Sequence, residues 1–144
     1  MPGNVDPIFS RIGSVSKANG TTFGGTILTA TGDYTGASAN HQLVWTADAT
    51  NGGFIQRLRF KAIGTNIATV ARIYLNNGSA NTTAANNVFF GEIALPATTA
   101  SNTAATAEID YPLGFSLDPG FCIYVGVATT VAAGWICTAL GGKY

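Results

Sequence analysis

Few side chains in this chain could carry out catalysis, and they are widely spaced. The single histidine, His41, begins the apolar run HQLVW, where we expect a surface or interface role rather than a general base. Glu108 and Asp110 are two residues apart and would share one strand face, as in a glycosidase dyad. We expect them instead to pair with basic side chains on a neighbouring strand. The chain is therefore not expected to be an enzyme.

The sequence pattern also predicts no cofactor and no metal site. Cys122 and Cys137 do not form a Cys-x-x-Cys pair, and a chain with one histidine offers no zinc ligand set. Their spacing favours free thiols over a structural disulfide. The glycine pairs lack the flanking residues of a phosphate-binding loop and are expected in turns.

Basic residues are concentrated on one predicted strand. In segment 53–76, two alternating runs flank the turn sequence Gly-Thr-Asn at 64–66, which predicts a β-hairpin. In the first run one face carries Phe54, Leu58, Phe60 and Ala62, and the other face carries Arg57, Arg59 and Lys61. A nucleic-acid surface needs aromatic and basic groups on the same side, so nucleic acid is not an expected partner.

Charge is scarce in the chain as a whole. Seven Lys and Arg balance seven Asp and Glu, and charged residues make up 10% of the sequence, against about 25% in a typical soluble domain. A neutral chain of this kind tends to associate, which favours a protein that works in an assembly. No apolar run approaches membrane-spanning length, and the start, MPGNVDPIFSRIGS, lacks a signal pattern. We therefore expect no membrane partner and synthesis in the cytoplasm.

Short apolar runs separated by Gly, Asn, Asp and Pro indicate an all-β fold. We predict eight strands, at residues 26–30, 41–47, 54–63, 67–75, 87–95, 106–112, 121–129 and 135–140. Regular spacing of this kind is typical of an antiparallel sandwich or barrel. We expect an eight-stranded, jelly-roll-like β-sandwich over residues 26–144, preceded by an extended N-terminal arm over residues 1–25.

The jelly-roll strand order can be tested against the charges. It places the third predicted strand beside the sixth, and the fourth beside the fifth. The basic side chains of the third and fourth strands then face acidic ones, as cross-strand ion pairs require. The predicted groups are Arg57, Arg59 and Lys61 with Glu108 and Asp110, and Arg72 with Glu92.

The N-terminal arm carries apolar residues in an irregular, Pro- and Gly-containing context. Such an arm must pack on its own sandwich or on a neighbour. The candidate assembly contacts are Ile8, Phe9, Arg11 and Phe23.

Aromatic residues leave a carbohydrate-binding alternative open. Trp45 and Trp135 lie inside apolar strands and are expected in the core. Tyr34 lies in a Gly-rich loop and is the best candidate for an exposed ring that could stack on a sugar.

Three features of the carboxyl-terminal third resemble the closing strands of capsid decoration, or cement, proteins of tailed bacteriophages. They are LDPGF at 117–121, IYVGVATTVAAGW at 123–135 and the terminal TALGGKY. The resemblance implies a virion structural protein on the outer head surface, a homotrimer that clamps neighbouring subunits of the major capsid protein. It rests on turn pattern and architecture, so no site residues are carried over. The alternative is a phage tail, baseplate or fibre module that binds a host-surface glycan.

Overall fold

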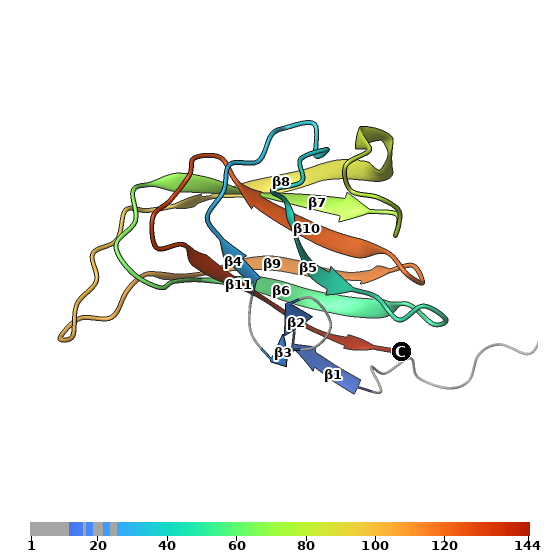
Figure 1. Cartoon of the computed structure of the whole chain (residues 1–144). Coiled ribbons are helices and arrows are strands. Elements are labelled where there is room, and N and C mark those ends of the chain that lie inside the picture. Colours follow the sequence, from blue (N-terminus) through green and yellow to red (C-terminus); the bar gives the residue numbers. More distant parts are fainter. Residues whose placement is uncertain (1–11, 16, 19–21, 24–25) are drawn as a thin grey trace, which may run out of the picture.

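The protein is an antiparallel β-sandwich. The computed structural model describes residues 12–15, 17–18, 22–23 and 26–144, and side chains from Leu28 onward. Two antiparallel sheets face each other in Figure 1, and the described residues contain no α-helix. In this part of the chain no helix is long and apolar enough to cross a membrane.

The first sheet has five strands and the second has four. The first contains β1 (Ile12–Val15), β4 (Thr26–Leu28), β6 (Gly53–Ala62), β9 (Glu108–Leu117) and β11 (Trp135–Lys143), in the order β1-β11-β6-β9 with β4 also on β11. The second contains β5 (Gln42–Thr46), β7 (Thr69–Asn76), β8 (Asn87–Leu95) and β10 (Cys122–Val127), in the order β5-β10-β7-β8. A separate ribbon pairs β2 (Lys17–Ala18) with β3 (Thr22–Phe23), and a 3₁₀ turn, η1 (Ala84–Asn86), precedes β8.

The all-β class and the two antiparallel sheets were predicted correctly, whereas the strand count was not. Each predicted segment overlaps one observed strand, and the predicted neighbours of the third and fourth strands are the observed ones. The first sheet has a further strand, β1, which lies within the predicted arm and pairs with β11. Strand β9 also continues through Pro112 to Leu117, because an edge strand tolerates a proline.

The predicted β-hairpin at 53–76 is wrong, because β6 and β7 belong to different sheets. The connection between them crosses the sandwich and is held by the buried side chain of Asn66. Its amide donates to the carbonyls of Gly64 and Gly134 and to the Thr98 hydroxyl. Its oxygen accepts from the backbone N–H groups of Ala133 and Gly134. The loops that hold Gly64, Thr98 and Gly134 meet at this side chain, which a tight hairpin between β6 and β7 would not allow.

The predicted faces of β6 are correct only after its bulge. Its pairing with β9 shifts register between Ile55 and Arg57, so the alternation changes phase at this point. Ile55, not Phe54, is therefore fully buried, while Leu58 and Phe60 point inward as predicted.

The core lies between the two sheets. Trp45 and Trp135 are buried in it, as the sequence predicted, and both cysteines are free and buried. Burial raises the pKa of the Cys137 thiol, so this group stays protonated. Trp135 and Phe60 are among the largest fully buried side chains of this core, whereas the equally buried Tyr74 packs against His41 and Phe89.

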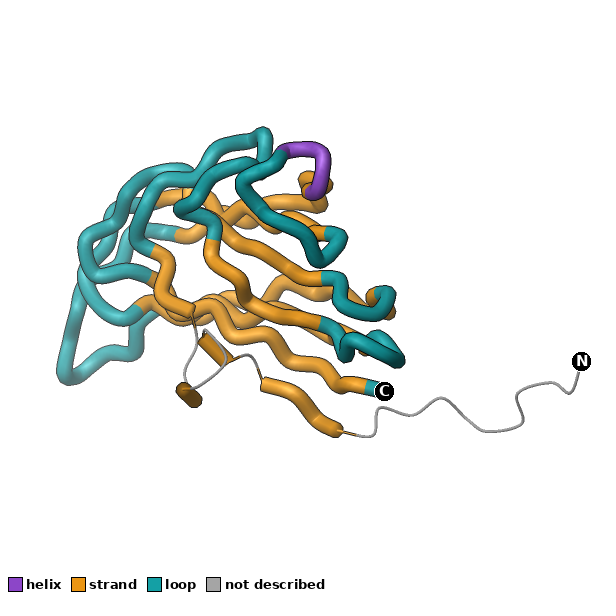
Figure 2. The backbone as a smooth tube through the Cα atoms, turned by 45° about the vertical axis from the view of Figure 1, so that its right-hand side comes forward, coloured by secondary structure: helices purple, strands orange, loops and turns teal. Residues whose placement is uncertain are grey.

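One side of the sandwich is less well closed. Strands β8 and β9 are edge strands that approach each other, with the rings of Phe90 and Phe115 5.2 Å apart. Inward-facing apolar side chains on these two strands are only partly buried, namely Ile93, Ile109, Tyr111, Leu113 and Phe115. Figure 2 shows most of the long loops at the opposite end of the strands from the chain's C-terminus.

Candidate functional site

An ion-pair network covers the outer face of the first sheet. Arg59 on β6 lies 2.9 Å from Asp110 and 3.4 Å from Glu108 on β9, and Arg57 lies 3.8 Å from Asp110. The Arg59 hydrogen bond lowers the pKa of the Asp110 carboxyl, and the same contact raises the pKa of Arg59. The predicted pairing is therefore present for these four residues. Exposed pairs of this kind stabilise only weakly because solvent screens them.

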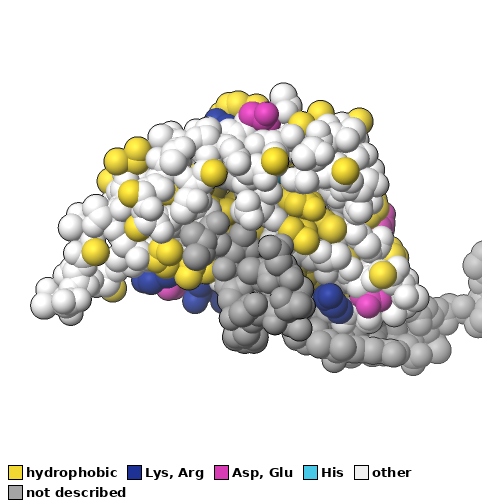
Figure 3. All heavy atoms as spheres, viewed as in Figure 1, with side chains coloured by type: hydrophobic (Ala, Val, Ile, Leu, Met, Phe, Trp, Pro, Cys, Tyr) yellow, Lys and Arg dark blue, Asp and Glu magenta, His cyan; other side chains and the backbone are white. Residues whose placement is uncertain are grey.

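Lys61 does not join this network within the described residues. Its Cα is opposite that of Glu108, but its Nζ donates to the backbone carbonyl of Thr106 at 2.8 Å. The ion pair predicted for Lys61 is therefore not observed. Arg59 and Lys61 of this basic stripe (Arg57, Arg59 and Lys61) therefore have close partners within the protein, whereas Arg57 makes only the long contact with Asp110. Where charges occur in Figure 3, acidic and basic groups for the most part lie close together.

A second cluster joins the outer face of the other sheet to the loop before β5. Arg72 on β7 lies 3.9 Å from Glu92 on β8, as predicted, and its guanidinium covers the Tyr34 ring at 3.7 Å. The Tyr34 hydroxyl donates to Glu92 at 3.3 Å, and the Phe89 ring meets Tyr34 edge-on. Tyr34 is 59% exposed, as the sequence predicted, but one ring face is already occupied. This leaves less ring surface for stacking on a sugar.

His41 is buried, which contradicts the surface or interface role predicted for it. Its ring stacks on Tyr74 at 4.4 Å and fits beside Gly32 and Gly126, where a Cβ atom would collide with the imidazole. Nε2 accepts from the Asp33 backbone N–H, so Nδ1 carries the proton and donates to the Gly36 carbonyl. His41 thus anchors its loop, because both ring nitrogens contact backbone groups of residues 33 and 36.

The buried His41 should make stability depend on pH. Burial lowers its pKa below 6.5, while the Gly36 hydrogen bond and nearby Asp33 oppose that shift and Arg72 adds to it. As the pH is lowered, His41 of the unfolded chain therefore binds a proton at a higher pH than His41 of the folded chain. The free energy of unfolding should consequently fall as the pH drops below 6.5. Titrating the only histidine by NMR should give a midpoint below 6.5. His41→Gln should remove the change in unfolding free energy between about pH 5.5 and 7.5. A midpoint at or above 6.5 would contradict the proposed neutral anchor.

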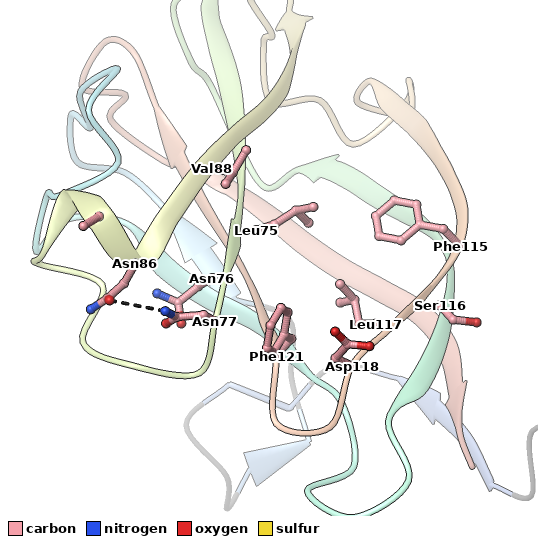
Figure 4. Close-up of a pocket in the computed structure, with 11 residues that line it drawn as sticks. Leu75, Asn76, Asn77, Asn86, Val88, Phe115, Ser116, Leu117, Asp118 and Phe121 are labelled. Atoms are coloured by element: carbon pink, nitrogen blue, oxygen red, sulfur yellow. Dashed lines mark hydrogen bonds between the residues drawn. The ribbon is translucent and has the colours of Figure 1, made fainter.

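A groove lies at the end of the open side, between the start of β8 and the end of β9. It encloses about 360 Å³, and Figure 4 shows its side chains converging from both sheets. The apolar lining is Leu75, Ala85, Val88, Phe115, Leu117 and Phe121, and the polar lining is Asn76, Asn77, Asn86, Ser116 and Asp118. Val88 is 64% exposed at its rim, and Phe89 and Phe90 follow it on the surface. These residues form the most apolar exposed stretch of an edge strand in the described part.

The polar wall of this groove is held in place by contacts within the protein. The Asn77 amide donates to the side-chain oxygen of Asn86 at 3.3 Å, as drawn in Figure 4, and Asn76 donates to the Asn87 side chain at 2.8 Å. The Ser116 hydroxyl lies 2.9 Å from that of Tyr144. Asp118 differs, because its carboxylate has no ion pair or hydrogen bond with any described residue.

The candidate assembly residues lie mostly outside the described part of the chain. Ile8, Phe9 and Arg11 are not described, and Phe23 is described only as a backbone position in β3, opposite Lys17. Sequence reasoning missed the groove. The run Val88-Phe89-Phe90, which breaks the alternation expected of a half-buried strand, was the available signal.

The chemistry available to the described residues is limited. Glu108 and Asp110 both face Arg59, and no group of three or more metal-ligating side chains lies together in the residues from 12 onward that are described. Comparison of the chain with protein-family models, curated proteins and solved structures found no match.

Proposed function

We propose that this protein is a phage virion structural protein, a decoration or cement protein that binds the outer surface of the head. In this proposal it is a jelly roll that acts as a homotrimer and stabilises contacts between subunits of the major capsid protein. The strand orders β4-β11-β6-β9 and β5-β10-β7-β8 support the jelly-roll assignment. The role needs no catalytic group and no cofactor.

The observation that carries the proposal is the exposed apolar edge of β8 beside the groove. Val88, Phe89 and Phe90 are all exposed there, while the charged groups on both sheet faces are mostly neutralised within the molecule. Contiguous exposed apolar side chains are typical of a surface that binds another protein. A protein that repeats on a symmetric shell also gains binding strength from several weak contacts at once.

Imaging of purified virions tests the proposal directly. A label attached after Tyr144, at the end of the chain, is expected at regularly repeated positions on the head. Absence of the protein from purified virions would contradict a structural role. A label on the tail would instead support the alternative, a tail, baseplate or fibre module.

Removal of residues 2–11 should abolish decoration without unfolding the sandwich. The deletion stops before β1, because that strand pairs with β11 and its loss would expose a new sheet edge. Occupancy on undecorated heads is the measurement, with an unchanged thermal unfolding midpoint as the folding control. A matched chain with Thr99→Arg in the loop before β9, where Thr99 is exposed, should decorate normally. Full occupancy by the shortened chain would refute a role for the arm.

The glycan-binding alternative has one supporting observation, the exposure of Tyr34. If this alternative holds, the original chain should bind on a glycan array and the Tyr34→Ala variant should not. The Arg72 guanidinium over the ring makes this the weaker candidate.

A further inference from the structure

The groove at the β8–β9 end combines two features that no contact within the described residues explains. One is its apolar lining, in which Val88 is 64% exposed and Leu75, Phe115 and Phe121 are only partly buried. The other is the Asp118 carboxylate, which lies beside Leu117 at the groove and has no described partner. A ligand that fits both features has an apolar part and, close to it, a positive charge.

We propose that this groove binds residues 1–11 of a second copy of the chain. The Phe9 ring enters the apolar groove and the Arg11 guanidinium pairs with Asp118. Within residues 1–11, Arg11 is the sole basic side chain, and it lies two residues from Phe9. Pro7 is likewise two residues from Phe9. Because alternate residues of an extended segment lie on the same face, such a segment would present Pro7, Phe9 and Arg11 together. The order of groups on the segment thus matches the apolar groove and its neighbouring carboxylate.

Chain geometry favours a second copy over the same molecule. Ile12 pairs with Lys143, which pairs with Gly53, which pairs with Leu117. Three strand spacings, about 14 Å in all, therefore separate Ile12 from Leu117 across the sheet. The Cα of Arg11 is only about 4 Å from that of Ile12. The Arg11 side chain would have to cross the ends of β11 and β6 to reach its own Asp118, whereas that of another copy has no such limit.

The proposed contact is heterologous, because the arm of one copy meets the groove of the next. Such contacts close into a ring when the rotation between copies permits it, and otherwise form open chains. The contact does not depend on the capsid proposal, since it concerns only copies of this chain.

Photo-crosslinking of the full chain tests which groove is occupied. A photoreactive phenylalanine analogue replaces Phe9, and ¹⁵N-labelled and unlabelled protein are mixed before irradiation. Crosslinks to residues 75, 88 or 115–121 that join one labelled peptide to one unlabelled peptide are expected. Crosslinks found only within one copy, or only elsewhere on the surface, would overturn the proposal.

A charge reversal tests the ionic contact in solution. Sedimentation velocity of the full chain should show self-association, weakened about fivefold by Asp118→Arg or by Arg11→Asp alone. The double variant should associate within about twofold of the original chain, because the pair is restored with opposite signs. Asp118→Asn, which keeps a turn-forming residue, should also weaken association but less than Asp118→Arg, whereas exposed Thr99→Arg should not weaken it.

The outcomes separate this inference from the capsid proposal. A monomer at all concentrations, or single variants that associate normally, would overturn the inference even if the protein decorates heads. Association that follows the charge pattern would support it even if no head is bound.

Discussion

Replacement of Asn66 by alanine is expected to destabilise the protein by about 3–4 kcal/mol, because several buried polar groups would lose their partners. The Asn66 side chain is almost fully buried and ties the loop after β6 to the loops that hold Thr98 and Gly134. It accepts from the N–H groups of Ala133 and Gly134 at 3.0 and 2.7 Å.

Chemical denaturation with far-ultraviolet circular dichroism measures this loss. Asn51→Ala is the matched control, since Asn51 is exposed and its side chain makes one long contact, 3.5 Å, with the Tyr144 carbonyl. The control is expected to change stability by less than about 0.5 kcal/mol. Asn66→Asp should also be destabilising, because a carboxylate accepts from the two N–H groups but cannot donate to Gly64 and Gly134. If Asn66→Ala and Asn51→Ala were equally stable, the crossing would not depend on this side chain.

Trp135→Ala is expected to cost about 3–5 kcal/mol, the usual range for removing a buried aromatic side chain. Trp135 begins β11 and is completely buried between the sheets. Its indole Nε1, however, has no acceptor among the described residues. Trp135→Phe should therefore cost clearly less than Trp135→Ala, because it keeps most of the apolar contact and removes an unpaired N–H.

Thermal and urea unfolding of the two Trp135 variants, compared at equal protein concentration, provide the measurement. Phe115→Ala is a useful comparison, because this ring on edge strand β9 is only partly buried and should cost less than Trp135→Ala. Equal losses for Trp135→Phe and Trp135→Ala would contradict the expected ranking of the two variants.

Local patterns in the sequence determined much of the fold. Alternation and turn residues located the eight predicted segments, each of which overlaps an observed strand. The assumed strand order placed the basic strand 54–63 beside the acidic strand 106–112, and the ion pair of Arg59 with Asp110 confirms that these strands are neighbours. This was possible because cross-strand pairs depend on strand order and period alone.

Residues whose environment depends on distant segments were not predictable in this way. The bulge before Arg57 places Ile55 in the core, where simple alternation had predicted Phe54. A register shift between β7 and β8 likewise accompanies the exposure of both Phe89 and Phe90. The sequence does not show a bulge, because an inserted residue is recognised only when the partner strand is in place.

The basic side chains on β6 and the groove at the β8–β9 end show the difference between what the sequence determines and what depends on the tertiary structure. Composition and alternation by themselves determined that the chain is neutral and all-β and that Arg59 pairs with Asp110 and Arg72 with Glu92 across strands. Tertiary structure alone decided that His41 is buried between Gly32 and Gly126 and that Asp118 lies beside an apolar groove. The physical reason is that burial and pocket shape arise from packing between segments far apart in the chain, which no local period encodes.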